Sequence, residues 1–223
     1  MTRSSWPRFQ ASLLGLALLA GCSQTSYVDR DVGRQDAGAL NPFDRVVEYH
    51  LELGLVASRP TCIAVGSVGV AVGAPQGQRI VDAVHLALLT RVPTLLPDVT
   101  IVEIDSDPAS AIFESSIRGC PYVLLIEIIA QDDAYLLVWS RKRVGIRARL
   151  VRVDDQEELW SAQHTATRSE GDVPVSPFGA VVSAFRAKDF ADDNDVIPSM
   201  IDDAVRRILA AFPMATGSRG GAT

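Results

Sequence analysis

The chain has 223 residues, enough for one domain with a substantial core, and 48% of them are hydrophobic, which excludes wholesale disorder. Its formal net charge is −6, and an acidic balance argues against nucleic acid as the main partner. Aromatic residues make up only 6% of the chain, which disfavours stacking platforms for bases or sugars.

The N-terminal residues predict a secretory signal peptide. Arg3 and Arg8 form a positive n-region in front of the Leu-rich run Ala11–Ala20. That run is far shorter than the roughly 20 residues that a membrane-spanning helix needs. We therefore expect residues 1–21 to be a signal peptide that is removed from the mature protein.

A lipidation motif closes this segment. Leu19-Ala20-Gly21-Cys22 matches the bacterial lipobox, in which the cysteine receives fatty acyl chains such as palmitate. Two or three acyl chains form a stable membrane anchor. The next residue is Ser23 rather than Asp, which favours the outer membrane. The sequence therefore predicts a protein lipid-anchored at Cys22 on the periplasmic face of the outer membrane.

The mature chain divides into three segments. Residues 22–41 hold the lipidated cysteine and a polar, Gly-containing tether, residues 42–213 form a single α/β domain, and residues 214–223 are a disordered tail. Apolar residues recur at helical spacing in residues 42–57, which predicts a short helix there.

The first half of the domain predicts a β-α-β-α-β unit with parallel strands. Pro93 and Pro97 mark the end of its first helix, and Asp107 is placed to cap its second helix. The expected elements are a strand over 61–72, a helix over 78–92, a strand over 99–104, a helix from Asp107 to Gly119 and a strand over 121–130.

The second half predicts antiparallel strands and a closing helix. Strands are expected over 134–139, 143–153 and 157–168, with the short polar connections 131–133 and 154–156 favouring antiparallel hairpins. Residues 170–194 are expected to form a long surface loop, whose middle, Phe178–Phe190, is compatible with a short helix. A broad apolar stripe predicts a last helix capped by Asp195 and stopped by Pro213. The expected fold is thus an α/β, three-layer-like sandwich with a mixed sheet.

Two cysteines remain after Cys22. Cys62 begins the first strand of the β-α-β-α-β unit and Cys120 begins the third. With a 2-1-3 strand order these strands are parallel neighbours, and the periplasm is oxidising. We expect a disulfide between Cys62 and Cys120, with a buried pair of free thiols as the alternative.

This order of elements resembles the periplasmic domain shared by CsgG-like and LpoB-like outer-membrane lipoproteins, PelC and the N-terminal domain of TolB. The matching stretches span roughly residues 60–212 and are IAVGSVGV, QRIVDAVHLALL, DVTIVEID, CPYVLLIEII, VGIRARLVRVDDQEELWSAQHTA and DVIPSMIDDAVRRIL. The resemblance implies a non-enzymatic assembly, export or regulatory component of the cell envelope.

The residues themselves predict no catalytic site, cofactor or metal. His50, His85 and His164 lie far apart and form none of the spacings typical of zinc sites, and no nucleophile elbow is present. Two alternatives to the assembly role stay open. One is an envelope hydrolase with an unrecognised site, and the other is a passive structural lipoprotein.

A basic strand predicts the partner surface. Arg147 and Arg149 alternate with apolar residues and so share one strand face, which is either a solvated face or a docking surface. Exposed charge pairs contribute only about 0–1 kcal/mol each, so an apolar patch must share the contact. Val181, Val182 and Phe185 are the candidates for that patch. We expect a homo-oligomer or an envelope protein partner.

Overall fold

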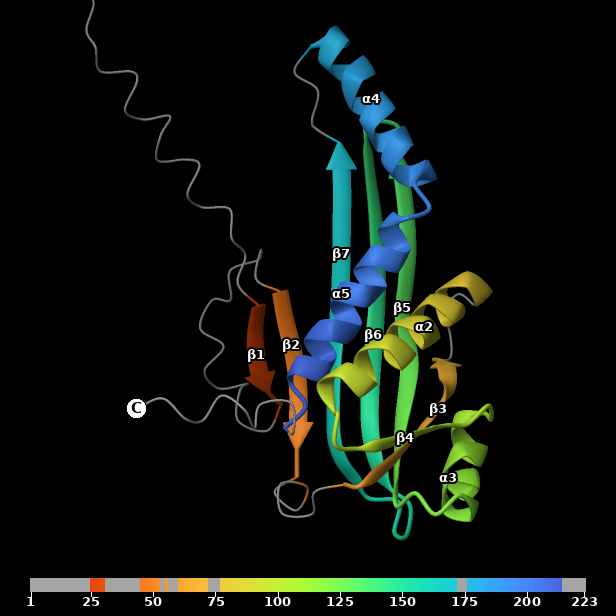
Figure 1. Cartoon of the computed structure of the whole chain (residues 1–223). Helices are drawn as coiled ribbons and strands as arrows, with labels where there is room; N and C mark the ends of the chain where they lie inside the picture. Colours follow the sequence, from red (N-terminus) through yellow and green to blue (C-terminus); the bar gives the residue numbers. More distant parts are fainter. Residues whose placement is uncertain are drawn as a thin grey trace, which may run out of the picture.

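The computed structural model describes residues 25–30, 45–52, 55, 60–71, 77–171 and 176–213 (Figure 1). Its elements are β1 (Thr25–Asp29), β2 (Arg45–Leu51), β3 (Cys62–Val70), α2 (Gln78–Leu95), β4 (Thr100–Glu103), α3 (Pro108–Ile117), β5 (Tyr122–Leu136), β6 (Trp139–Arg152), β7 (Glu158–Gly171), α4 (Pro177–Asp192) and α5 (Val196–Ala210). The predicted signal peptide, Cys22, Ser23 and the tail 214–223 lie outside the described residues.

The strands of the described residues form one seven-stranded mixed sheet in the order β1-β2-β7-β6-β5-β3-β4. β3 pairs in parallel with both β4 and β5, so the predicted 2-1-3 order is confirmed. β5, β6 and β7 are antiparallel neighbours, and β2 is antiparallel to β7. β1 adds a parallel strand at the edge beside β2. The predicted α/β class with a mixed sheet is therefore confirmed.

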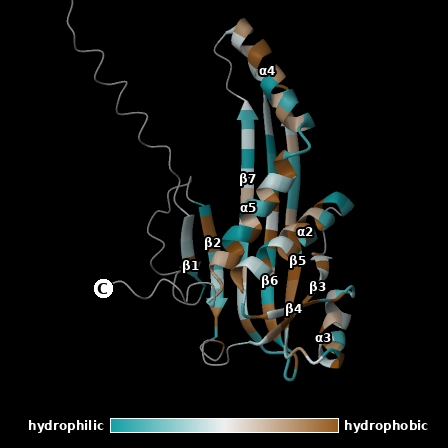
Figure 2. Ribbon diagram, viewed as in Figure 1, coloured by the Kyte–Doolittle hydropathy of each residue, from teal (hydrophilic) through white to brown (hydrophobic). Residues whose placement is uncertain are grey.

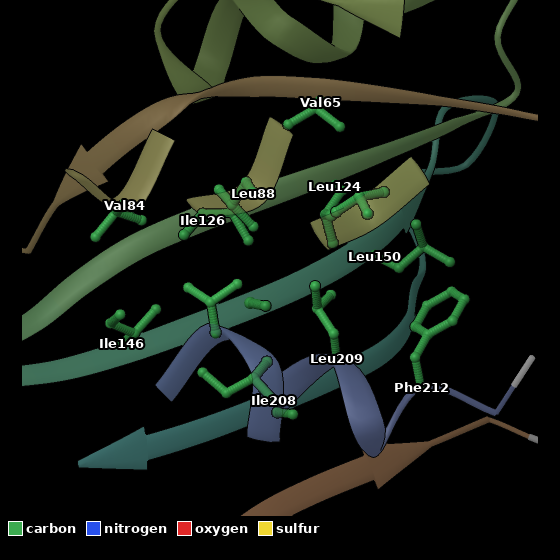
Figure 3. Packing of buried hydrophobic residues seen from close by; sticks show 14 of the residues in the cluster. Val65, Val84, Leu88, Leu124, Ile126, Ile146, Leu150, Ile208, Leu209 and Phe212 are labelled. Carbon is green, nitrogen blue, oxygen red and sulfur yellow. The ribbon is translucent and has the colours of Figure 1, made fainter. Parts of the chain in front are cut away.

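The main core lies between the sheet and helices α2 and α5, on what we call the helix-covered face (Figures 1 and 3). Ile146, Ala148 and Leu150 of β6 point into this core because side chains alternate between the two faces of a strand. Trp160 of β7 packs edge-on against Phe212, with ring centroids 4.9 Å apart. Burial of one Val, Leu, Ile, Phe or Met side chain contributes about 1.5–3 kcal/mol to the stability of the fold.

A smaller core lies on the opposite face, where α3 packs over β3 and β5. Its buried residues are Ala64, Ile104, Ala111, Cys120, Val123, Leu125 and Val151. Gly66 permits this close packing, since a Cβ there would lie 3.2 Å from the Cβ of Ala111. Asp107 caps α3 as predicted, accepting a hydrogen bond from the Ser110 amide. Helices on both faces give the predicted three-layer arrangement.

Strands β5, β6 and β7 continue past their neighbours as a three-stranded ribbon (residues 129–136, 139–145 and 165–171). The last residue of β5 paired with β3 is Ile128, and the last residue of β7 paired with β2 is His164. α4 lies along the helix-covered side of this ribbon (Figure 1). Lys142 fixes it there, donating to the Asp193 carbonyl at 2.7 Å and lying 5.6 Å from the Phe190 ring.

The helix predicted over residues 42–57 is wrong, because Arg45–Leu51 form strand β2. Val47, Tyr49 and Leu51 alternate along that strand and pack against the main core, so the apolar pattern fits a period of two as well as a helix. β1 lies within the range assigned to the tether, so part of that range is paired to the sheet.

The polar triplet 131–133, predicted as a connection between strands, is not a turn, because it lies inside β5. The strand continues to Leu136, and the hairpin turns at residues 137 and 138. Both faces of the ribbon reach solvent in places, and there an acidic side chain can pair across the strands. Asp132 does so, accepting a hydrogen bond from Arg141 at 2.6 Å.

The predicted long loop over residues 170–194 contains a full helix, α4, which begins after the N-cap Ser176.

Two helix boundaries also differ from expectation. α2 continues through Pro93 to Leu95, so this proline lies within the last turn of the helix and does not end it. Asp195 precedes α5 but its side chain makes no capping hydrogen bond.

Candidate functional site

The structure separates the predicted partner residues into two surfaces. Arg147 and Arg149 lie mid-sheet on the face opposite α2, α4 and α5, beside the part that α3 covers. Val181, Val182 and Phe185 lie on α4, at the ribbon and on the other side of the sheet. The sequence alone does not separate them, because a predicted loop over residues 170–194 has no defined position relative to the sheet.

The first surface is a row of polar side chains across four strands, which we call the polar row (Glu48, Glu127, Arg147, Arg149 and Gln163). Arg147 donates to the Gln163 side-chain oxygen at 3.1 Å and lies 3.6 Å from the Glu127 carboxylate. Gln163 in turn donates to Glu48 at 2.8 Å. The row therefore links β5, β6, β7 and β2 through their side chains.

The charge of this face is mixed rather than basic. Arg149 lies 4.0 Å from Glu158, and Arg147 is compensated by Glu127. Both arginine side chains are 39% exposed, so solvent screens these pairs. The acidic partners were missed from sequence because only the strand register shows which residues lie opposite each other.

The second surface is an exposed apolar stripe on α4. The residues that face the ribbon are small, with Ser183 and Ala187 buried. The large ones face outward, with Phe178 79% and Phe185 65% exposed. Phe178, Val181, Val182 and Phe185 recur at helical spacing, a pattern that is visible in the sequence and adds Phe178 to the three predicted residues.

The β5–β6 hairpin adds apolar side chains at the same end of the ribbon. Tyr135, Leu136 and Leu137 are all exposed there. The pKa of Lys188 on α4 is raised mainly by Asp192 and to a smaller extent by Tyr135. We call the hairpin residues and the α4 stripe together the apolar tip. Figure 2 shows apolar residues on α4 at the far end of the strands. The apolar tip holds seven of the eleven exposed large hydrophobic residues found in the described part of the chain.

A small polar cavity lies between α5, β7 and the start of β2. Its volume is about 50 Å³, enough for a few water molecules, and it is lined by Arg45, His164, Thr165, Ala166, Thr167, Arg168, Met200 and Asp203. His164 is 3% exposed, and its Nδ1 donates to the Val46 carbonyl at 2.7 Å. Burial lowers the pKa of His164, and the nearby Arg207 lowers it further, although the Val46 carbonyl opposes this.

Asp203 compensates the positive charges of Arg206 and Arg207 beside this cavity. Burial raises the pKa of its carboxyl, but hydrogen bonds from Arg207 and Arg206 outweigh that effect and hold the pKa at about 2. Arg207 is buried and donates to Asp203 at 2.7 Å. This carboxylate is therefore engaged in a structural ion pair. In the described residues, no group of three or more His, Cys, Asp and Glu side chains could hold a metal ion.

The structure joins Cys62 and Cys120 in a disulfide with Cα atoms 5.1 Å apart. Cys62 is the first residue of β3, and Cys120 lies two residues before β5 begins. These two strands are adjacent and parallel. Ser115 stabilises the same corner by donating to the Cys120 carbonyl at 2.8 Å. The bond therefore ties the two strands together beneath α3. None of the described helices is long and apolar enough to cross a membrane.

No family model matches this sequence, and no curated protein matches it significantly. Among solved structures, a PelC dodecamer from Paraburkholderia phytofirmans has a TM-score of 0.46 and 17% identity, covering 74% of this chain and 94% of that one. A lipoprotein from Neisseria meningitidis has a TM-score of 0.39 and 22% identity, covering 60% of this chain and 100% of that one. The LpoB C-terminal domain from Salmonella enterica has a TM-score of 0.32 and 14% identity, covering 49% and 84%. These neighbours are domains of the bacterial periplasmic and outer-membrane lipoprotein kind.

Proposed function

We propose that this chain is an outer-membrane lipoprotein, acylated at Cys22 and facing the periplasm, that acts as a non-catalytic assembly, export or regulatory component of the envelope. The lipobox after a short apolar run supports the anchor. The ordered resemblance over residues 60–212 to CsgG-like, LpoB-like, PelC and TolB domains supports the class of function. The observation that carries the docking role is the polar row.

The polar row is suited to protein docking because its side chains are already held in place. Arg147 is fixed between Glu127 and Gln163, and Gln163 is fixed by Glu48, while each arginine stays half-exposed. A partner that binds side chains already ordered loses less conformational entropy than one that must order them. Alternating acidic and basic groups also select a partner with the complementary pattern.

We propose that one such partner is a second copy of the chain. A contact between two different surfaces of one molecule closes into a ring when the rotation permits. The PelC chain named above is a dodecamer. For the present chain, self-association or docking to another envelope protein rests on its own polar row.

The test reverses the two arginines and measures assembly. Arg147→Glu with Arg149→Glu should abolish self-association in sedimentation at low salt and abolish crosslinks to partners in cells. The thermal midpoint should fall only slightly, because the new like charges beside Glu127 and Glu158 are solvent-screened. The matched control is Arg118→Glu with Arg206→Glu. These two arginines are ion-paired, one directly after α3 and the other on α5, and their reversal should leave assembly intact.

A second variant separates docking from folding. Arg147→Gln with Arg149→Gln removes both charges without placing like charges beside Glu127 and Glu158. It should fold normally and assemble weakly. Wild-type chain that stays monomeric at every concentration and salt level, and yields no crosslinked partner in cells, would contradict the proposal.

A further inference from the structure

The apolar tip projects from the same end of the molecule from which the chain's N-terminal segment departs. Thr25 of β1 pairs with Arg45, and two residues further along β2, Val47 pairs with His164 of β7. β7 then continues toward the ribbon end as far as Gly171. Figure 1 shows β7 and α4 extending beyond the start of β1.

The length of chain between the lipobox cysteine and β1 limits how far the tip can stay from a bilayer. Three peptide units separate Cys22 from Thr25, a reach of about 10 Å at full extension. Gly171 lies about five strand residues past the level of Thr25, which is about 16 Å. If acyl chains on Cys22 enter a membrane and the strands stand upright, the tip therefore reaches the lipid.

The composition of the tip fits a lipid surface. The first nine residues of α4, Pro177–Phe185, carry no charge and expose their large apolar side chains. Tyr135 and Trp139 of the hairpin add aromatic rings of the kind that gather at membrane interfaces. Residues 131–144 and 165–192 together hold six basic and six acidic residues, so this end is neutral in a chain of net charge −6. Anionic headgroups therefore repel it less than the rest of the protein.

We propose that the apolar tip docks on the membrane surface, with the stripe Phe178, Val181, Val182 and Phe185 of α4 lying among the lipid headgroups. This inference rests on the proposed anchoring at Cys22, which brings the tip to the bilayer. The helix lies in the interface without crossing the membrane, as amphipathic helices with one apolar stripe do. The lipid anchor and the tip then act as two contacts that set the orientation of the sheet.

The experiment places one indole at the tip and another at the opposite end of the fold. The full chain is purified from bacterial membranes and reconstituted in vesicles of phosphatidylethanolamine and phosphatidylglycerol with brominated acyl chains. One variant is Phe185→Trp, and the matched control is Phe113→Trp on α3, where the phenylalanine is 72% exposed. Both carry Trp139→Phe, and the fluorescence of the Trp139→Phe parent is subtracted.

We expect brominated lipid to reduce the added fluorescence of Phe185→Trp at least twofold and to leave that of Phe113→Trp unchanged. Chain that sediments with the vesicles while neither indole is quenched would overturn the inference and leave the anchor intact. Equal quenching of both indoles would overturn the orientation. A blue-shifted but unquenched indole at residue 185 would place α4 against protein, and would also overturn it.

Mass analysis of the same sample distinguishes this inference from the proposed anchoring. Quenching at residue 185 in chain that carries no acyl group would support the tip contact and contradict acylation of Cys22. Unacylated chain that stays in the supernatant would overturn both the acylation of Cys22 and the contact between the apolar tip and the membrane.

Discussion

His164 is a buried side chain that makes the stability of the fold depend on pH. Its Nδ1 donates a hydrogen bond to the Val46 carbonyl, and the charged groups around it are Arg207, Arg45 and Asp203. Because burial and Arg207 lower its pKa, the folded protein keeps the imidazole neutral where the unfolded chain would protonate it. The contribution to stability is therefore present above the ordinary His pKa of about 6.5 and is lost as the pH falls below it.

The first prediction tests this pH dependence with His164→Asn, whose amide can still donate to the Val46 carbonyl. The wild-type free energy of unfolding should fall between about pH 7.5 and pH 5.5, and the variant should lose less. Urea midpoints at the two pH values measure the difference. The folded pKa of Asp203 is about 2, so its ion pairs weaken only below about pH 4 and stay outside this window. If the urea midpoints of the wild type and the variant fell equally between the two pH values, the proposed role of His164 would be contradicted.

The second prediction concerns Cys62 and Cys120. The bond closes a loop with a sequence separation of 58 and should stabilise the fold by about 4 kcal/mol in the chain-entropy model. Thiol titration of denatured, non-reduced Cys22→Ser protein should find no reactive cysteine, and reduction should lower the urea midpoint. Two reactive thiols per chain would show instead that the pair is unbonded.

At the scale of elements, the β5–β6 hairpin and the end of β7 depend on a glycine. Gly171 has φ +120°, which L side chains rarely adopt, and a Cβ there would lie 2.2 Å from the Val138 carbonyl oxygen. The β7 strand can therefore end against the hairpin only with glycine at this position. Loss of that contact would loosen the ribbon on which α4 lies.

The third prediction follows from this contact. Gly171→Ala should destabilise the fold by about 3 kcal/mol, because it combines a strained backbone with a steric clash. Gly77→Ala is the control, since its nearest new contacts are at ordinary van der Waals distance and its φ is −103°. Thermal melts of both variants give the comparison. A Gly171→Ala protein as stable as Gly77→Ala would mean that the hairpin relaxes at little cost.

The elements that could be predicted from sequence are those with one long apolar signal. β3, β5, α2 and α5 each carry such a run, and the βαβ rule orders the parallel strands. β2 is not predictable in this way, because a few apolar positions satisfy both a period of two and a period of 3.6. The β5–β6 turn is not predictable either, because Asp132 has the composition of a turn residue and its pairing with Arg141 depends on the strand register.

The candidate surfaces were predictable only in part, and for a similar reason. Arg147 and Arg149 could be assigned to one strand face by alternation. Their partners Glu127, Gln163 and Glu158 come from other strands, so only the sheet register brings them together. Local spacing carries no information on such non-local contacts.

At the scale of the whole molecule, the negative net charge favours release from an anionic membrane, whereas the proposed lipid anchor favours attachment to it. Removing residues 1–21 takes away Arg3 and Arg8, so the mature chain would hold 19 basic and 27 acidic residues. Anionic lipid would repel a body of that charge. Attachment to the membrane would therefore depend on acyl chains and on uncharged surface, which makes Cys22 the residue to test first.

The fourth prediction is that Cys22→Ser releases the protein from the outer membrane. Wild type should incorporate labelled palmitate and fractionate with outer membrane, and the variant should do neither, since a single apolar patch holds far less tightly than two or three acyl chains. Gly77→Ala serves as the control, because its new contacts are at ordinary van der Waals distance and it should leave fractionation unchanged. Unlabelled wild type together with a variant that still sediments with outer membrane would contradict the anchor.

The ribbon of β5, β6 and β7 divides the molecule into regions of unequal protection against hydrogen exchange. Between Tyr122 and Ile128, β5 has a paired neighbour on each side, so its amides exchange only when the whole sheet opens. Beyond Ile128 the outer edge of β5 has no described partner strand, and the same holds for β7 beyond His164. The ribbon can therefore open with α4 as a separate cooperative unit while the remaining sheet stays closed. Exchange followed by mass spectrometry should show peptides from 131–144 labelled well before those from 122–128. Contact of the ribbon with a membrane or a partner would slow exchange in 131–144 and reduce this difference in rate.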